Sequence, residues 1–175
     1  MTDERNNNAA DFAALLDFLD DTPAQLTNFT RALTDVDLRL QSSPGEFSAL
    51  ENICHLRDLE LQGYTTRIRR ILSETEPALA DFDGARVAAE SFYNNEQLDT
   101  ALSAFQQARR ENVATLRSLT EALRQRSGTL EGVGRITLRR LAEMMREHDE
   151  GHLDDLRILS QRLKHRAETE SSQAS

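Results

Sequence analysis

Several features that commonly mark a protein's class are scarce or missing in this chain. It has a single cysteine, Cys54, so no internal disulfide can form, which fits a reducing cytoplasm. It has only seven glycines and three prolines, and no convincing alternating apolar pattern, which argues against a β-sheet fold. No apolar run approaches the length of a membrane span, and the polar start MTDERNNNAADF lacks the order of a signal peptide. We therefore expect a cytoplasmic protein.

Clusters of positive charge are missing as well. The 175 residues include 21 lysines and arginines against 30 aspartates and glutamates, giving a formal net charge of −9. Nucleic acids and anionic membranes both favour clustered cations, so an acidic chain of this kind argues against either as the main partner. The densest basic stretch, RLKHR at residues 162–166, has the composition of a helix C-terminus.

What the chain does contain favours an all-α fold. Leucine, alanine, arginine and glutamate are abundant, and apolar residues recur at intervals of three and four. Four helices are predicted, at residues 10–33, 47–73, 98–125 and 137–167. Pro23 suits a first helical position and predicts a kink or break in the first helix, whereas Ser48 and Glu51 predict a capping box that opens the second.

The helix lengths and connections predict a four-helix bundle. Helices two and three are joined by one long connection, residues 74–95, and the other connections are short. The bundle is expected to cover residues 10–167. Residues 1–9 and 168–175 are polar and are expected to be disordered.

Two histidines interrupt the apolar stripe of the fourth helix. His148 and His152 are four residues apart and therefore share one helix face. The stripe consists of Leu138, Leu141, Met145, His148, His152, Leu156, Leu159 and Leu163. Both imidazoles are thus expected inside the bundle. The intervening Gly151 costs a helix about 1 kcal/mol relative to alanine, which suggests that another group approaches it closely.

The third helix also carries polar residues within its apolar stripe. The stripe consists of Leu98, Leu102, Phe105, Arg109, Asn112, Leu116, Leu119 and Leu123. An unpaired guanidinium in a core is costly. Arg109 therefore implies a cavity, a carboxylate partner or an anionic ligand.

The second helix supplies a third histidine. Its apolar stripe consists of Phe47, Leu50, Cys54, Leu61 and Ile68, and a polar stripe beside it consists of Glu51, His55, Asp58 and Gln62. Together, His55, His148 and His152 predict a metal site. Neutral imidazole binds Zn, Ni or Fe(II), and three protein ligands leave positions open for water or substrate. The alternative is a hydrogen-bonded core cluster, or a solvated histidine pair, without metal.

Two carboxylates lie near these histidines in the sequence. Glu51 is one turn before His55 and fits either a role beside the histidine or a helix cap. Asp149 directly follows His148, at the position where the zincin motif requires glutamate, so that motif does not apply.

Three segments resemble the DinB/YfiT-like superfamily. FSALENICHLRDLE at residues 47–60 resembles its second helix, AFQQARRENVATLRSL at 104–119 its third, and GRITLRRLAEMMREHDEGHLDDL at 134–156 its fourth. The resemblance extends over residues 26–163. One departure is Phe47, where many relatives have tryptophan before the serine.

The resemblance implies a four-helix bundle that binds a divalent metal ion (Zn, Ni or Fe) through His55, His148 and His152, and that often forms homodimers. Relatives include S-transferases that use bacillithiol or mycothiol, a mycothiol-dependent isomerase, and many members classed as metal-dependent hydrolases without an established reaction.

Two hypotheses follow for the function. The first is an enzyme that activates a low-molecular-weight thiol or water at the metal, with thiol transfer favoured over hydrolysis only by the resemblance. Arg109 and Asn112 would position a small anionic or polar substrate, and Glu51 or Asp149 would orient ligands or move protons. The second is a non-catalytic bundle that binds a partner or small molecule and keeps the histidines for stability.

Overall fold

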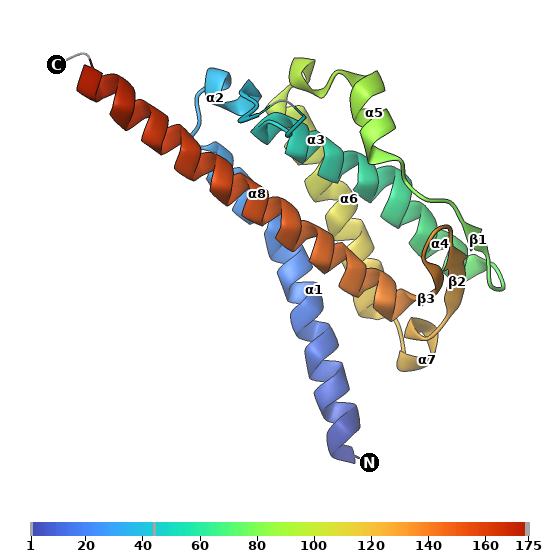
Figure 1. The fold of residues 1–175 in the computed structure, drawn as a ribbon. Helices are drawn as coiled ribbons and strands as arrows, with labels where there is room; N and C mark the ends of the chain where they lie inside the picture. The colour runs from blue at the N-terminus through green and yellow to red at the C-terminus, as the bar shows by residue number, and fades with distance from the viewer. Residues whose placement is uncertain (1, 44, 174–175) are drawn as a thin grey trace.

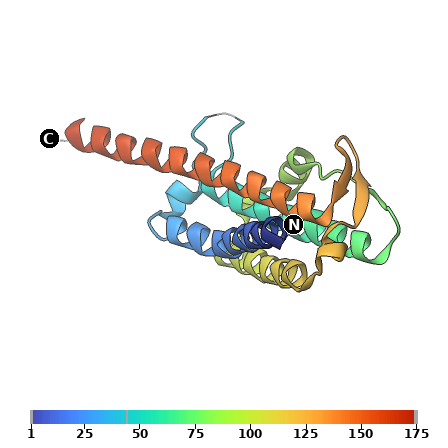
Figure 2. The ribbon, with the colours of Figure 1, turned by 90° about the horizontal axis from the view of Figure 1, so that it is seen from below.

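Four long helical units build the molecule (Figure 1). They are α1 (Thr2–Thr30), the joined α3 (Ala49–Asp58), η1 (Leu59–Tyr64) and α4 (Thr65–Ser73), then α6 (Leu98–Ser118) and α8 (Leu138–Gln173). This computed structural model describes residues 2–43 and 45–173. The predicted four-helix bundle is confirmed. The N-terminal part of α1 and the C-terminal part of α8 project beyond the other helices (Figures 1 and 2).

Helices α1 and α8 extend into the two terminal segments that the sequence predicts to be disordered. Residues 2–9 form the first turns of α1, and residues 168–173 form the last turns of α8. Residues 1, 174 and 175 lie outside the described part of the chain. The domain limits proposed from the sequence stay a prediction.

The first helix continues through Pro23, so of the predicted kink or break, the break is wrong. Proline lacks a backbone N–H, which leaves the carbonyl of Leu19 without its partner four residues later. The guanidinium of Arg109 on α6 donates to that carbonyl from its Nη1 atom at 3.2 Å. A group from another helix thus replaces the missing intrahelical hydrogen bond.

The second unit begins as predicted and then departs from a regular α-helix. Ser48 Oγ accepts from the backbone N–H of Glu51, and Glu51 Oε2 accepts from the backbone N–H of Ser48 at 2.7 Å, so the predicted capping box is confirmed. The segment η1 is a π-helix, and its wider turn shifts the faces of the residues that follow. As a result Leu61, predicted to be buried, is 43% exposed, and Glu60 is fully buried.

The long connection and the segment before α8 contain structure that the sequence did not predict. A three-stranded sheet of order β1-β2-β3 joins β1 (Ala78–Leu79), β2 (Ser127–Leu130) and β3 (Gly134–Thr137). β1 is parallel to β2 with Ala78 opposite Thr129, and β2 is antiparallel to β3 with Ser127 opposite Thr137.

Four short helices complete the described part of the chain. They are α2 (Asp35–Arg39), α5 (Gly84–Ser91), the 3-10 helix η2 (Tyr93–Asn95) and α7 (Glu121–Arg124). The predicted third helix therefore ends at Ser118 rather than residue 125, and Leu123 lies in α7, where it is 36% exposed. None of the described helices combines the length and apolar character that crossing a membrane requires.

The apolar core forms two main clusters along α8. The first lies toward the sheet and includes Leu138, Leu141 and Met145. The second lies farther along α8 and includes Leu156 and Leu159. Between these clusters α8 carries three polar residues, His148, Asp149 and His152.

Candidate metal centre

Three imidazoles from two helices converge at one point. His55 on α3 and His148 on α8 have their Nε2 atoms 3.3 Å apart, and the Nε2 atoms of His148 and His152 are 3.2 Å apart. Ligand atoms of all three residues lie within 4.8 Å of one another. The predicted apolar stripe of α8 explains this position, because Leu141 and Met145 before the partly buried histidines, and Leu156 and Leu159 after them, are buried.

Hydrogen bonding alone cannot satisfy this arrangement. His152 Nδ1 faces an amide oxygen, so it carries the ring proton and leaves Nε2 bare. His148 Nε2 then carries the one proton available to both contacts, so it can direct a linear hydrogen bond at only one of its two neighbours, His152 or His55. A cation accepts lone pairs from all three, and an ion held tetrahedrally at about 2.0–2.1 Å sets its ligand nitrogens about 3.3–3.4 Å apart. The three residues therefore fit a divalent metal ion.

Asn52 fixes the orientation of His152. Its Oδ1 atom accepts from His152 Nδ1 at 2.6 Å, while its Nδ2 atom donates to the carbonyl of Ser48 at 2.9 Å and to that of Phe47 at 3.4 Å. The two backbone acceptors determine which side of the amide is oxygen. This contact holds His152 in the tautomer whose Nε2 lone pair points into the cluster. Sequence reasoning missed Asn52, although its position three residues before His55 places both on one helix face.

Apart from the contact of its Nε2 with His148, His55 is held by packing, and its Nδ1 has no hydrogen-bond partner among the described residues. Its ring lies near those of Phe47 and Phe82, with centroid separations of 5.6 and 6.0 Å. Gly84 leaves room for it, since a Cβ added there would lie 2.9 Å from His55 Nδ1. Phe82 and Gly84 belong to the long connection, where no sequence pattern marked them.

Burial keeps the imidazoles uncharged. Loss of water contact, reinforced by the neighbouring His152, lowers the pKa of His55 to about 4. Burial, followed by the charges of His152, His55 and Arg109, lowers the pKa of His148 to about 3. Burial also lowers the pKa of His152, and Asp149 opposes that effect. At neutral pH all three rings are thus available as neutral ligands.

Asp149, which directly follows His148 in the sequence, belongs to a buried network of charged and polar side chains. Arg109 donates to Asp149 through Nη1 at 2.5 Å and through Nη2 at 3.1 Å, and its Nη2 also donates to Glu60 at 2.8 Å. Asn112 Nδ2 donates to Glu60 at 2.7 Å. Arg109 is 1% exposed, and both carboxylates are fully buried. Of the three explanations offered for Arg109, the structure shows the carboxylate partner.

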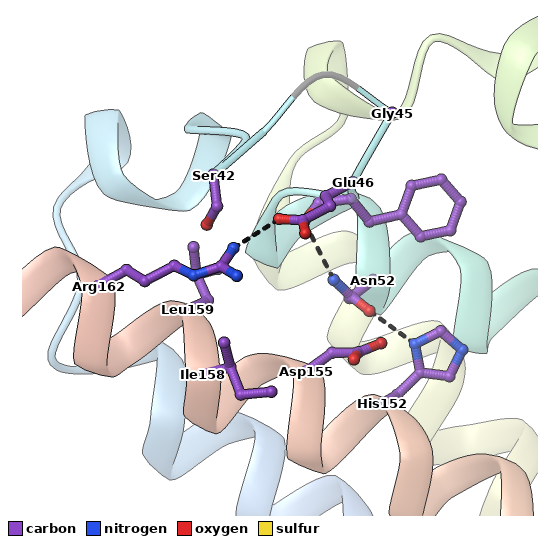
Figure 3. Close-up of a pocket in the computed structure, with 10 residues that line it drawn as sticks. Ser42, Gly45, Glu46, Asn52, His152, Asp155, Ile158, Leu159 and Arg162 are labelled. Carbon is purple, nitrogen blue, oxygen red and sulfur yellow. Dashed lines mark hydrogen bonds and ion pairs between the residues drawn. The ribbon is translucent and has the colours of Figure 1, made fainter.

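A cleft opens beside His152 (Figure 3). Its volume is about 390 Å³, within the usual range for small-molecule sites. One side comes from α8 and the other from residues 42, 45–47 and 52. Its lining includes Glu46, Phe47, Asn52, His152, Asp155, Ile158, Leu159 and Arg162.

The comparisons with known proteins agree with this architecture. The model of the DinB superfamily matches residues 8–156. The chain belongs to the DinB superfamily. Its fold is similar to that of YfiT from Bacillus subtilis, described as "a probable metal-dependent hydrolase with an unusual four-helix bundle topology", with a TM-score of 0.81, 22% identity and 87% of each chain covered. No curated protein matches the chain.

The other predicted site residues of this DinB-superfamily chain lie away from the cleft. Arg109, Asn112 and Asp149 have partners inside the bundle and do not line it. The carboxylate of Glu51 accepts from the backbone of Ser48 and from Gln41, so its contacts are those of a helix cap.

Two smaller sequence-based expectations can also be compared with the structure. Gly151 is exposed, and a Cβ added there would meet nothing within 4 Å, so the expected close approach is wrong. Cys54 is a buried core residue.

Proposed function

We propose that this DinB-superfamily protein is a metal-dependent enzyme that activates a low-molecular-weight thiol or water at His55, His148 and His152. The observation that carries the proposal is the meeting of three Nε2 atoms, whose two close contacts cannot both be linear hydrogen bonds. The description of the structurally similar YfiT as a metal-dependent hydrolase supports it.

The surroundings of the three ligands suit such a site. A divalent cation bound there would act as a Lewis acid and lower the pKa of a thiol or water. Three imidazoles suit Zn, Ni or Fe(II). Asn52 holds one ligand in its binding tautomer, and packing holds His55. A cleft that could hold a small molecule borders one of the three histidines, His152.

The thiol and water alternatives differ in the product. Thiol transfer, which the family resemblance favours, joins the sulfur of the thiol to an electrophile, whereas hydrolysis adds the elements of water to a substrate. The homodimer implied by the same resemblance stays a prediction that sedimentation would check.

Metal titration tests the first half of the proposal. Zn²⁺, Ni²⁺ or Fe²⁺ should bind in a 1:1 ratio to the chain and raise its melting temperature, since a ligand at 100 times its Kd stabilises the native state by about 2.7 kcal/mol. His148→Ala should abolish the shift. His165→Ala is the matched control, because His165 is exposed near the end of α8. Melting that is unaffected by all three metals would instead support a non-catalytic bundle.

Product analysis tests the second half. Metal-loaded wild-type protein should accelerate conjugation of an electrophile such as 1-chloro-2,4-dinitrobenzene to a small thiol, or hydrolysis of a test ester or amide. His148→Ala should lose this rate while His165→Ala keeps it. Stoichiometric metal without either reaction across thiol and hydrolase substrate panels would contradict the enzymatic proposal.

A further inference from the structure

Another, smaller cleft lies between η1, the start of α4 and the segment that follows β1. Its volume is about 100 Å³, and its lining includes Gln62, Thr66, Arg67, Arg70, Asp81 and Phe82. Phe82 also packs against His55, with ring centroids 6.0 Å apart, but none of the three clustered histidines lines this cleft. The cleft is thus a neighbour of the candidate metal centre and separate from it.

Arg67 brings a buried positive charge to this cleft. Its side chain is 7% exposed, and its Nη2 atom donates to the carbonyl of Ala80 at 3.1 Å. The carboxylate paired with it, Asp81, lies 3.7 Å from Nη2, beyond hydrogen-bond distance, and is 69% exposed. Such an open ion pair contributes little, whereas a buried cation is costly without a hydrogen-bonded counter-charge. Burial lowers the pKa of Arg67, and the nearby Tyr64 and Asp81 offset this effect only in part.

Two donor nitrogens of Arg67 remain without an acceptor. Neither Nε nor Nη1 forms a hydrogen bond with a described residue, and of the two only Nε is fully buried. A Cβ added at Gly63 would lie 3.8 Å from Nη1, so the missing side chain leaves this nitrogen uncovered on that side. The hydroxyl of Thr66 and the amide of Gln62, on the same lining, also have no hydrogen-bond partner among the described residues.

Two other arginines show what Arg67 lacks. Arg70, on the same lining, donates to Glu74 at 2.7 Å from both Nε and Nη2. Arg109 donates to two buried carboxylates inside the bundle. Of these three arginines, Arg67 alone has no carboxylate within hydrogen-bond distance. Charge-assisted hydrogen bonds are about twice as strong as neutral ones, so an anion that reaches Nη1 gains a bond that Asp81 does not supply.

We infer that this cleft binds a small oxyanion of the size of phosphate or sulfate. Its oxygens accept from Nη1 of Arg67, with Thr66 and Gln62 as further donors, and the anion replaces Asp81 as the counter-charge of Arg67. The carboxylate of Asp81 repels the anion and competes with it, so removing that charge should favour binding. This inference is independent of the proposed function, because no histidine takes part in it.

Calorimetric titration of the full chain with inorganic phosphate, at an ionic strength held constant with chloride, tests the site. Arg67→Met should weaken phosphate binding at least about tenfold, the effect of one hydrogen bond to a charged group. Asp81→Asn should strengthen it about two- to fivefold, the range of a partly exposed charge pair. Arg69→Met is the matched control and should leave the affinity unchanged, because Arg69 is exposed on α4 and does not line the cleft.

Two further variants keep the test decisive. Thr66→Val removes a hydroxyl with little change of shape and should weaken binding even if Arg67→Met fails to fold. His148→Ala separates this site from the metal centre, since phosphate also binds metal ions, and it should keep the wild-type affinity for phosphate. Loss of binding in His148→Ala together with wild-type binding in Arg67→Met would place the anion at the histidines and overturn the inference.

A structural role of Arg67 gives a different set of results. If the arginine serves only to hold the segment at Ala80, the wild type does not bind phosphate at millimolar concentrations, or Asp81→Asn binds it no more tightly than the wild type does. Either result would refute the oxyanion site. Neither would affect the metal titration of the three histidines, so the two proposals fail separately.

Discussion

Replacing Arg109 by methionine should destabilise the protein more than any substitution on the exposed faces of α6. The change removes the one positive charge that contacts two fully buried carboxylates, Glu60 and Asp149. It also returns the carbonyl of Leu19 to the unpaired state that Pro23 creates. Methionine fills much of the same space, so the main effect is electrostatic rather than a loss of volume.

The expected magnitude follows from burial. Removing one partner of a buried ion pair costs about 3–5 kcal/mol, because the other partner is left charged without water. After the substitution, Glu60 keeps the hydrogen bond from Asn112 at 2.7 Å. Among the described residues, Arg109 alone donates side-chain hydrogen bonds to the carboxylate of Asp149. We therefore expect a loss of about 3–5 kcal/mol in the free energy of unfolding, a large part of the 5–15 kcal/mol or so of an ordinary domain.

Urea unfolding at pH 7, followed by circular dichroism, measures this effect. Arg110→Met is the matched control, because Arg110 is exposed on the same helix and bonds only Gln107 among the described contacts, so its loss should stay within about 0.5 kcal/mol. Adding Glu60→Gln and Asp149→Asn to Arg109→Met should recover part of the stability, since the stranded charges are then removed. A loss below about 1 kcal/mol for Arg109→Met, or no recovery in the triple variant, would refute the electrostatic explanation.

Three further predictions concern the histidine cluster and the single thiol. Asn52→Leu should weaken metal binding about 10- to 100-fold in a metal titration, because the tautomer of His152 is no longer fixed; unchanged affinity would contradict this role. Gly84→Ala should lower metal affinity and melting temperature, since its Cβ displaces the ring of His55; wild-type values in both assays would contradict it. Burial raises the pKa of Cys54 from 9.0 to about 12, so native protein should not react with Ellman's reagent at pH 8 until urea unfolds it. As pH rises, the thiol of Cys54 ionises in the unfolded protein before it ionises in the native protein. The free energy of unfolding should therefore fall between pH 9 and 12. A Cys54→Ala variant whose free energy of unfolding falls equally over this range would contradict that contribution.

The sequence identified the three histidines because helical periodicity is a local property. His148 and His152 could be placed on the inner face of α8 from the leucines around them, and the capping box at Ser48 and Glu51 follows from contacts within one turn. The same periodicity failed after residue 58. The π-helix of η1 shifts the register of the second unit, which buries Glu60 and exposes Leu61.

The all-α fold class and the candidate ligands were thus predicted from the sequence alone, because both depend on residue spacing within single helices. The tertiary structure decided which distant groups meet. Arg109 satisfies a carbonyl 90 residues away, Asn52 orients a histidine 100 residues away, and two strands of the sheet pair across about 50 residues. These contacts have no local pattern in the chain, since hydrogen bonds and ion pairs between helices depend on how the helices pack, and only the packed bundle specifies their partners.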